Sequence, residues 1–121
     1  MKRDMDLVRK ILMAIEASPL SVNSHEVELP DADDQVVSYH IMILNEAGLL
    51  VGIDVSDNER IRWLAVRLTW DGHDFVEAAR DDTRWAKAKR TITERGGVML
   101  VEVLKQLLVQ FARDAVFQSR V

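Results

Sequence analysis

The chain has 121 residues and a net charge of −4, with 48% apolar and 30% charged residues. This length predicts one domain of ordinary size, and the composition is typical of a globular protein with a substantial hydrophobic core. The absence of cysteine excludes disulfides, thiolate metal ligands and a cysteine nucleophile. Residues 1–6 lack the features of a signal peptide, and no segment is long and apolar enough to span a bilayer, so we expect a cytoplasmic protein.

Charge is distributed unevenly along the chain. Residues 11–59 contain no Lys or Arg but ten acidic residues, whereas residues 60–95 contain nine cations against six acids. The first ten residues carry a net charge of +2. A charge asymmetry of this size is informative about the binding partners of the protein, more than about its fold.

Hydrophobic periodicity predicts several helices and one β-hairpin. Some of the expected helices begin at an acidic or hydroxyl N-cap, and some end before a proline or at a glycine, because these residues satisfy or interrupt the terminal backbone groups. Asp31 or Asp33 is the N-cap expected for the second helix, and Gly48 is expected to end it. In chain order the expected elements are a helix over 4–17, a short strand over 25–29, a helix from the Asp31 or Asp33 cap to 47, strands over 49–55 and 60–68 with a polar tip at 56–59, a helix over 70–80 capped by Thr69, and helices over 83–95 and 98–117.

This order of elements indicates a mainly α fold with a small β-hairpin, arranged as a winged helix-turn-helix-like domain plus C-terminal helices. We expect the winged-helix-like domain to cover residues 1–82 and a C-terminal helical extension, used for dimerisation, to cover residues 83–121, the two packed as one compact unit. One departure from the usual pattern is visible. Only residues 25–30 stand where the first helix of a helix-turn-helix normally lies, which is too few for an ordinary helix.

Two segments resemble parts of known winged-helix regulators. Residues 37–50, VSYHIMILNEAGLL, resemble the recognition-helix signature of ArsR- and MarR-type proteins, and residues 67–75, RLTWDGHDF, resemble the segment after the wing in PadR- and MarR-type proteins. In this arrangement Val37, Ile41 and Leu44 face the core at helical spacing. The resemblance implies a winged-helix fold whose second helix enters the major groove of DNA.

A closer resemblance covers nearly the whole chain. It rests on four separated motifs that occur in order: MKRDMDL at residues 1–7, SYH at 38–40, LTWDGH at 68–73 and DDTRW at 81–85. Together they are similar to a bacterial and prophage family that is catalogued only as a domain of unknown function. This second resemblance implies almost no biochemistry.

The outward stripe of the second predicted helix consists of polar and flexible side chains that could read base edges or reach a phosphate. Its expected members are Gln35, Ser38, Tyr39, Met42 and Asn45. Cations lie nearby in sequence, at the start of the chain and on the second hairpin strand. The candidate DNA-binding residues are therefore Lys2, Arg3, Gln35, Ser38, Tyr39, Asn45, Arg60 and Arg62.

These residues favour the hypothesis of a DNA-associated transcriptional regulator or accessory factor of bacterial or prophage origin, bound to double-stranded DNA. The objection is electrostatic, because the second helix has no Lys or Arg while Asp33, Asp34 and Glu46 would lie near phosphates. The alternative is a protein–protein interaction module that kept the winged fold and does not bind DNA. The cation-free stretch over residues 11–59 would then suit a basic partner protein.

No constellation of residues points to an enzyme. His25, His40 and His73 lie far apart without a second ligand at metal-binding spacing, and the sequence has no nucleophile or phosphate-binding motif. We therefore predict no catalytic residue, no metal and no cofactor. His40 is expected to be half-buried and bonded to the backbone, and Trp70 is expected to anchor the helix after the hairpin.

The last predicted helix is more apolar than a helix on one side of its own domain needs to be. Eleven of the fifteen residues from 98 to 112 are apolar, whereas a docked helix needs an apolar stripe only about 100° wide. We expect a second subunit to cover the surplus in a homodimer with isologous C-terminal helices. The candidate interface residues are Val101, Leu104, Leu108 and Phe111. The alternative is a central helix wrapped by the helices over 4–17 and 83–95.

Overall fold

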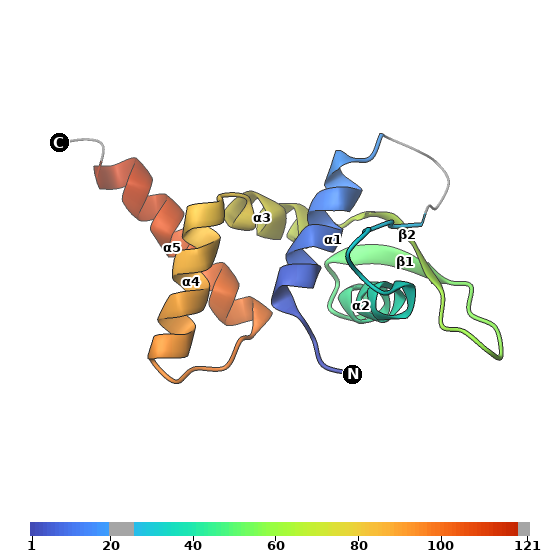
Figure 1. The fold of residues 1–121 in the computed structure, drawn as a ribbon. Helices are drawn as coiled ribbons and strands as arrows, with labels where there is room; N and C mark the ends of the chain where they lie inside the picture. Colours follow the sequence, from blue (N-terminus) through green and yellow to red (C-terminus); the bar gives the residue numbers. More distant parts are fainter. Residues whose placement is uncertain (20–25, 119–121) are drawn as a thin grey trace. The chain divides into compact units, whose positions relative to one another are not determined.

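The computed structural model describes residues 1–19 and 26–118. Its elements in chain order are α1 (Met5–Ala17), α2 (Asp34–Glu46), β1 (Leu50–Asp54), β2 (Trp63–Leu68), α3 (Trp70–Ala79), α4 (Asp82–Glu94) and α5 (Val101–Gln118) (Figure 1). The predicted fold class, mainly α with a small β-hairpin, is confirmed. Contacts within the chain define an N-terminal unit, Met1–Asp74, and a C-terminal unit, Phe75–Val121. The division therefore lies within α3, whereas the predicted division follows residue 82.

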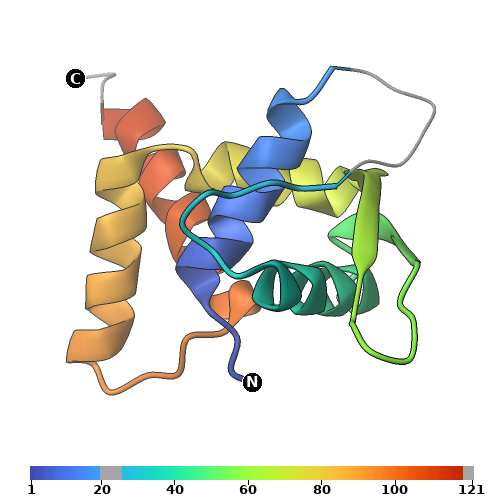
Figure 2. The same cartoon turned by 45° about the vertical axis from the view of Figure 1, so that its right-hand side comes forward.

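Helix α1 supplies much of the core of the N-terminal unit. Its N-cap is Asp4, whose carboxylate accepts the backbone N–H groups of Asp6 (3.0 Å) and Leu7 (3.2 Å), two donors that a helix start leaves unpaired. Ser18 ends the helix in extended backbone before Pro19, as the sequence predicts. The helix packs on α2 and β2 (Figures 1 and 2). Its buried stripe consists of Met5, Leu7, Val8, Ile11, Leu12 and Ile15.

Helix α2 leads directly into the hairpin. Asp33 is its N-cap, and the side chains of Val37, Ile41 and Leu44 are buried as the helical spacing predicts. Gly48 follows the helix with φ of +76°, the left-handed conformation that a side chain would disfavour and that lets the chain turn into β1. The second predicted helix and its exit are therefore confirmed.

The hairpin has shorter strands and a longer loop than predicted. Strands β1 and β2 pair antiparallel, with Leu50 opposite Leu68 and Asp54 opposite Trp63. Residues 55–62 form the loop between them. Serine and aspartate side chains of this region bond to the loop's own backbone, and such local bonds compete with the extension of a strand ladder.

Two predictions for the N-terminal unit are wrong. Residues 26–29 have no strand structure, and residue 25 lies outside the described part of the chain. A strand needs a neighbour for its backbone groups, and the sheet formed by the described residues holds only β1 and β2. Trp70 does not anchor α3, since 80% of its surface is exposed. The start of α3 is instead fixed by Thr69, whose hydroxyl accepts the N–H of Gly72 at 3.0 Å.

The C-terminal unit is built from the end of α3 and from α4 and α5, which pack on each other (Figure 2). Phe75 of α3 and Trp85 of α4 are both buried and meet edge to face, with their ring centroids 6.1 Å apart. Asp81 is the N-cap of α4, so the helix begins at Asp82, one residue before its predicted start. After α4 the chain turns at Gly96, with φ of +69°, and α5 begins at Val101 rather than at residue 98.

Candidate interaction surface of the N-terminal unit

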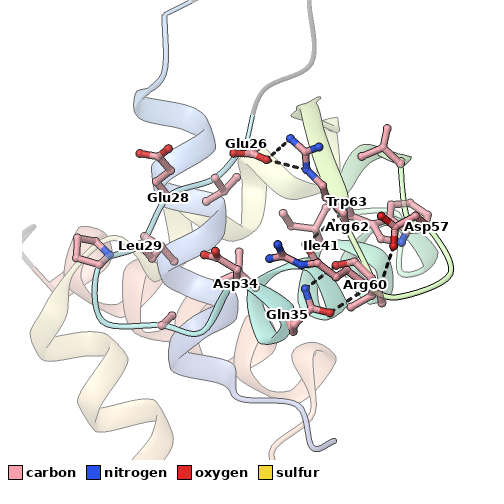
Figure 3. Close-up of a pocket in the computed structure, with 17 residues that line it drawn as sticks. Glu26, Glu28, Leu29, Asp34, Gln35, Ile41, Asp57, Arg60, Arg62 and Trp63 are labelled. Atoms are coloured by element: carbon pink, nitrogen blue, oxygen red, sulfur yellow. Dashed lines mark hydrogen bonds and ion pairs between the residues drawn. The ribbon is translucent and has the colours of Figure 1, made fainter.

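A cavity of about 600 Å³ lies in the N-terminal unit where the 26–32 segment, α2 and the hairpin loop meet (Figure 3). The amide of Gln35 and the carboxylate of Asp34 enter it from α2, and Arg60 and Arg62 enter it from the loop. Its walls therefore bring the hairpin loop together with the 26–32 segment and α2, which lie earlier in the sequence. The contacts that hold these segments together decide which side chains remain available to a partner.

Gln35 clamps the hairpin loop onto α2. Its side-chain N–H donates to the carbonyl oxygen of Ile61 at 3.0 Å, and its side-chain oxygen accepts the N–H of Ile61 at 3.0 Å (Figure 3). The amide thus pairs with both backbone groups of one loop residue, as a neighbouring strand would. Nothing in the local sequence indicates this contact, because its two residues are 26 positions apart.

Two further polar side chains of α2 bind the hairpin backbone. The hydroxyl of Ser38, which is buried, accepts the N–H of Trp63 at 3.1 Å. The side-chain oxygen of Asn45 accepts the N–H of Gly52 at 3.0 Å. Backbone donors of a small sheet that are shielded from water need such acceptors, and α2 supplies them.

The expected outward stripe of α2 is therefore wrong for three of its members. Gln35, Ser38 and Asn45 face the hairpin, and their oxygens are already occupied by backbone N–H groups. Reading a base edge would require breaking these bonds. Tyr39 and Met42, the other two members, are half-buried.

The outer face of α2 consists instead of Val36, Tyr39, Ile43 and Glu46, which recur at helical spacing. The first three side chains are half-buried and Glu46 is exposed. We refer to these four residues as the α2 outer face. It offers apolar and aromatic surface beside a carboxylate, and the helix that carries it has no Lys or Arg.

The remaining DNA-binding candidates are exposed cations. Lys2 and Arg3 lie before α1, and Arg60 and Arg62 lie in the hairpin loop. Arg62 forms an ion pair with Glu26 (Figure 3). The Nε and Nη2 atoms of Arg62 both donate to Oε1 of the Glu26 carboxylate. Part of the positive charge at the hairpin is therefore neutralised by the segment beside it.

The N-terminal unit as a whole is strongly acidic. Residues 1–74 contain seven Lys and Arg against fourteen Asp and Glu, a net charge of −7, whereas residues 75–121 carry nine cations against six acids, a net charge of +3. The unit that carries α2 and the hairpin would therefore repel a polyanion such as DNA at long range, where net charge steers association. The change in the sign of the net charge thus coincides with the boundary between the two units.

Two aspartates order the hairpin loop. The hydroxyl and N–H of Ser56 donate to Asp54 and hold the pKa of its carboxyl below the ordinary value of 3.8. The N–H groups of Glu59 and Arg60 donate to Asp57 at 2.8 Å each, and they lower the pKa of its carboxyl in the same way. Both carboxylates are solvent-exposed, so these bonds organise the loop locally.

We expect the loop to lose this order in acid. Because the pKa of Asp57 is lower in the folded loop than its ordinary value of 3.8, the contribution of its carboxylate is complete above that value and is lost as the pH falls through the lowered pKa. The amide proton signals of Glu59 and Arg60 in NMR spectra should therefore titrate with a midpoint below 3.8. Asp57→Asn should abolish this titration while Asp54 retains its own. A midpoint at or above 3.8 would contradict the prediction.

His40 has a structural role, as predicted, but it is more deeply buried than expected. None of its surface is exposed. Its Nδ1 lies 2.8 Å from the carbonyl oxygen of Val36, which can only accept, so Nδ1 carries the proton. Its Nε2 accepts the backbone N–H of Asp4 at 2.9 Å. The neutral ring thus connects α2 to the start of α1.

The candidate dimer-interface residues of α5 are divided by the structure. Leu104 and Leu108 have no exposed surface in the chain, so a second copy could not contact them. Val101 and Phe111 are half-buried. The buried side of α5 is centred on the pair at 104 and 108, because these two side chains pack inside the chain. The homodimer itself stays a prediction.

Within the described residues, no group of three or more His, Asp or Glu side chains could hold a metal ion. In the same part of the chain, no helix combines the length and the apolar character that crossing a membrane requires.

Comparison with known proteins shows that the chain is similar to a described family and to an individual protein. The family described as "Hypothetical protein (DUF2513)" matches residues 2–98. An "Uncharacterized protein" of Haemophilus influenzae is 36% identical over 111 residues, a span that covers 88% of this chain and 92% of that relative. No solved structure matches the chain.

Proposed function

The chain belongs to the family described as "Hypothetical protein (DUF2513)", and we propose that it is a protein-interaction module with a winged-helix-like N-terminal unit that does not read DNA sequence. The proposal rests on the observation that the α2 side chains suited to reading bases already form hydrogen bonds within the chain. Gln35, Ser38 and Asn45 bind the backbone of the hairpin instead. The module is not an enzyme, and we expect it to act in the cytoplasm.

Electrostatics supports a protein partner over DNA. The affinity of proteins for DNA depends mainly on cations that contact phosphates, and the N-terminal unit has a net charge of −7. The same charge favours encounter with a basic protein. The α2 outer face would then provide an apolar centre around Tyr39 and Ile43, next to the carboxylate of Glu46.

The hairpin adds exposed apolar surface of the same kind. Ile53, in β1, and Val55, the first residue of the loop, expose 45% and 39% of their surfaces. Side chains of this type contribute to protein interfaces through burial of apolar area. We therefore assign the hairpin and the α2 outer face to protein binding.

A second candidate function is DNA-associated regulation, the leading hypothesis from the sequence. It is favoured by three exposed cations of the N-terminal unit. Lys2 and Arg3 lie at the start of the chain, and Arg60 lies in the hairpin loop. In this case the contact would be made to the phosphate backbone by the chain start and the hairpin loop, without base readout by α2. Such binding would be weak and strongly dependent on salt.

The two candidates are distinguished by one pair of measurements. A photo-reactive amino acid placed at Tyr39, on the α2 outer face, should cross-link in cells to a protein rich in Lys and Arg. The same group placed at Lys10, an exposed residue of α1, serves as the matched control and should give no such product. Glu46→Lys should reduce the Tyr39 product severalfold, because it reverses the charge beside the apolar centre.

Duplex DNA of random sequence should show no saturable binding to the purified chain up to about 100 µM at 50 mM salt, measured by fluorescence anisotropy. Micromolar binding that weakens steeply between 50 and 200 mM salt, and that is lost in the Arg60→Glu variant, would instead support the second candidate. Absence of any protein cross-link from Tyr39 alongside such binding would rule out the interaction module.

A further inference from the structure

A groove in the C-terminal unit is independent of the surface proposed above. It has a volume of about 790 Å³ and is formed by α4, the connection after it and the first three turns of α5. Its apolar residues are Ile92, Val98, Leu100, Val103, Leu107 and Phe111. Val98 and Leu100 expose 68% and 41% of their surfaces, whereas Ile92 is buried and forms part of the floor. The groove is therefore an apolar surface that the chain itself leaves partly uncovered.

The charged residues that line the groove are both cations. Lys87 lines it from α4 and Arg95 from the C-cap of that helix, and none of the described residues that line it is Asp or Glu. The two cations are eight positions apart along α4 and its C-cap, so their Cα atoms are roughly 12 Å apart along the helix axis. The Nζ atom of Lys87 lies 4.2 Å from the centre of the Phe111 ring, which places this charge directly over the apolar wall.

We propose that this groove docks an acidic amphipathic helix of a partner protein. A groove between two packed helices suits a third helix, whose apolar side chains at positions i, i+3 or i+4 and i+7 enter it. Val103, Leu107 and Phe111 recur at four-residue intervals along α5 and form the complementary row. Acidic side chains on either flank of the bound helix would meet Lys87 and Arg95, and the side-chain amides of Gln106 and Gln110 can bond to its polar rim.

Charge favours this occupant over a second copy of the chain. In an isologous dimer the same patch meets itself, so the Lys87 and Arg95 side chains of both copies would be brought to one interface without a carboxylate in the groove to offset them. An acidic helix removes this repulsion and pairs both cations. The C-terminal unit, with a net charge of +3, also attracts such a partner at a distance.

The proposal is tested on the full chain with a pair of synthetic peptides. The first is a fluorescein-labelled 16-residue helix with Leu at the i, i+3, i+7 and i+10 positions and Glu elsewhere on its flanks, and the second has Lys in place of every Glu. We expect the acidic peptide to bind with a micromolar Kd by anisotropy and the basic peptide at least tenfold more weakly. Hydrogen exchange should show protection confined to residues 87–111.

Variants of the chain locate the binding. The double variant Lys87→Glu/Arg95→Glu changes only exposed side chains and should weaken the acidic peptide at least tenfold. Arg113→Glu is the matched control, because Arg113 is an exposed cation of α5 outside the groove, and it should leave the Kd within twofold. Leu100→Ser should weaken binding severalfold through loss of apolar contact.

Three outcomes would overturn the proposal. The first is equal binding of the acidic and basic peptides. The second is an equal loss of affinity in Arg113→Glu and in the double variant. The third is a mass twice 13.8 kDa in light scattering that returns to the monomer value in Leu100→Ser, since a second copy would then occupy the groove.

Discussion

Gly72→Ala should lower the stability of the protein by about 3 kcal/mol and its Tm by roughly 10 °C. A Cβ atom at position 72 would lie 1.9 Å from the carbonyl oxygen of Leu49, far inside van der Waals contact. The obstacle is backbone, so no rotation of a side chain can relieve it. The start of α3 would have to move away from the end of the α2–β1 connection.

Such a movement would break a junction that several bonds hold together. The hydroxyl of Thr69 donates to the carbonyl oxygen of Gly48 at 2.6 Å, and the N–H of Thr69 donates to the carbonyl oxygen of Leu49 at 3.2 Å. The same hydroxyl caps α3 by accepting the N–H of Gly72. Thermal unfolding followed by circular dichroism measures the loss. His73→Ala, at the exposed neighbouring position, is the control and should stay within about 0.5 kcal/mol. A Tm for Gly72→Ala within about 2 °C of the parent would show that α3 can shift freely.

His40→Ala should cost about 2–4 kcal/mol, the second largest effect we expect. The substitution removes a fully buried ring and leaves a cavity between α1 and α2. It also removes the acceptor for the N–H of Asp4, the residue that caps α1. Urea unfolding monitored by circular dichroism should show a lower midpoint.

A second variant separates packing from hydrogen bonding at this position. His40→Leu restores most of the buried volume but offers no acceptor to Asp4, so it should recover only part of the loss. The start of α1 should then exchange its amide protons faster than in the parent, although the core remains filled. Equal stability of His40→Leu and the parent would contradict a role for the two bonds of the ring.

The sequence by itself determined the local elements of this protein. Caps and stops are chemical properties of single residues, so Asp33, one of the two N-caps expected for α2, starts this helix and Gly48 marks its exit in the structure. The apolar spacing of Val37 and Leu44 also identified the core side of α2, because a helix buries whichever stripe is continuous. The mainly α fold class with its hairpin followed from these signals.

Only the tertiary structure decided how the polar side of α2 is used. The width of an apolar stripe says nothing about which of its two flanks a hairpin will cover, since the docking angle depends on contacts between residues far apart in sequence. Gln35 reaches Ile61 across 26 positions, and Ser38 reaches Trp63 across 25. Polar residues that could read DNA are thereby bound to backbone, because hairpin donors shielded from water must be satisfied first. The same reasoning applies to the burial of Leu108. Local periodicity made this residue a candidate for the dimer interface, but packing within the chain buries it completely.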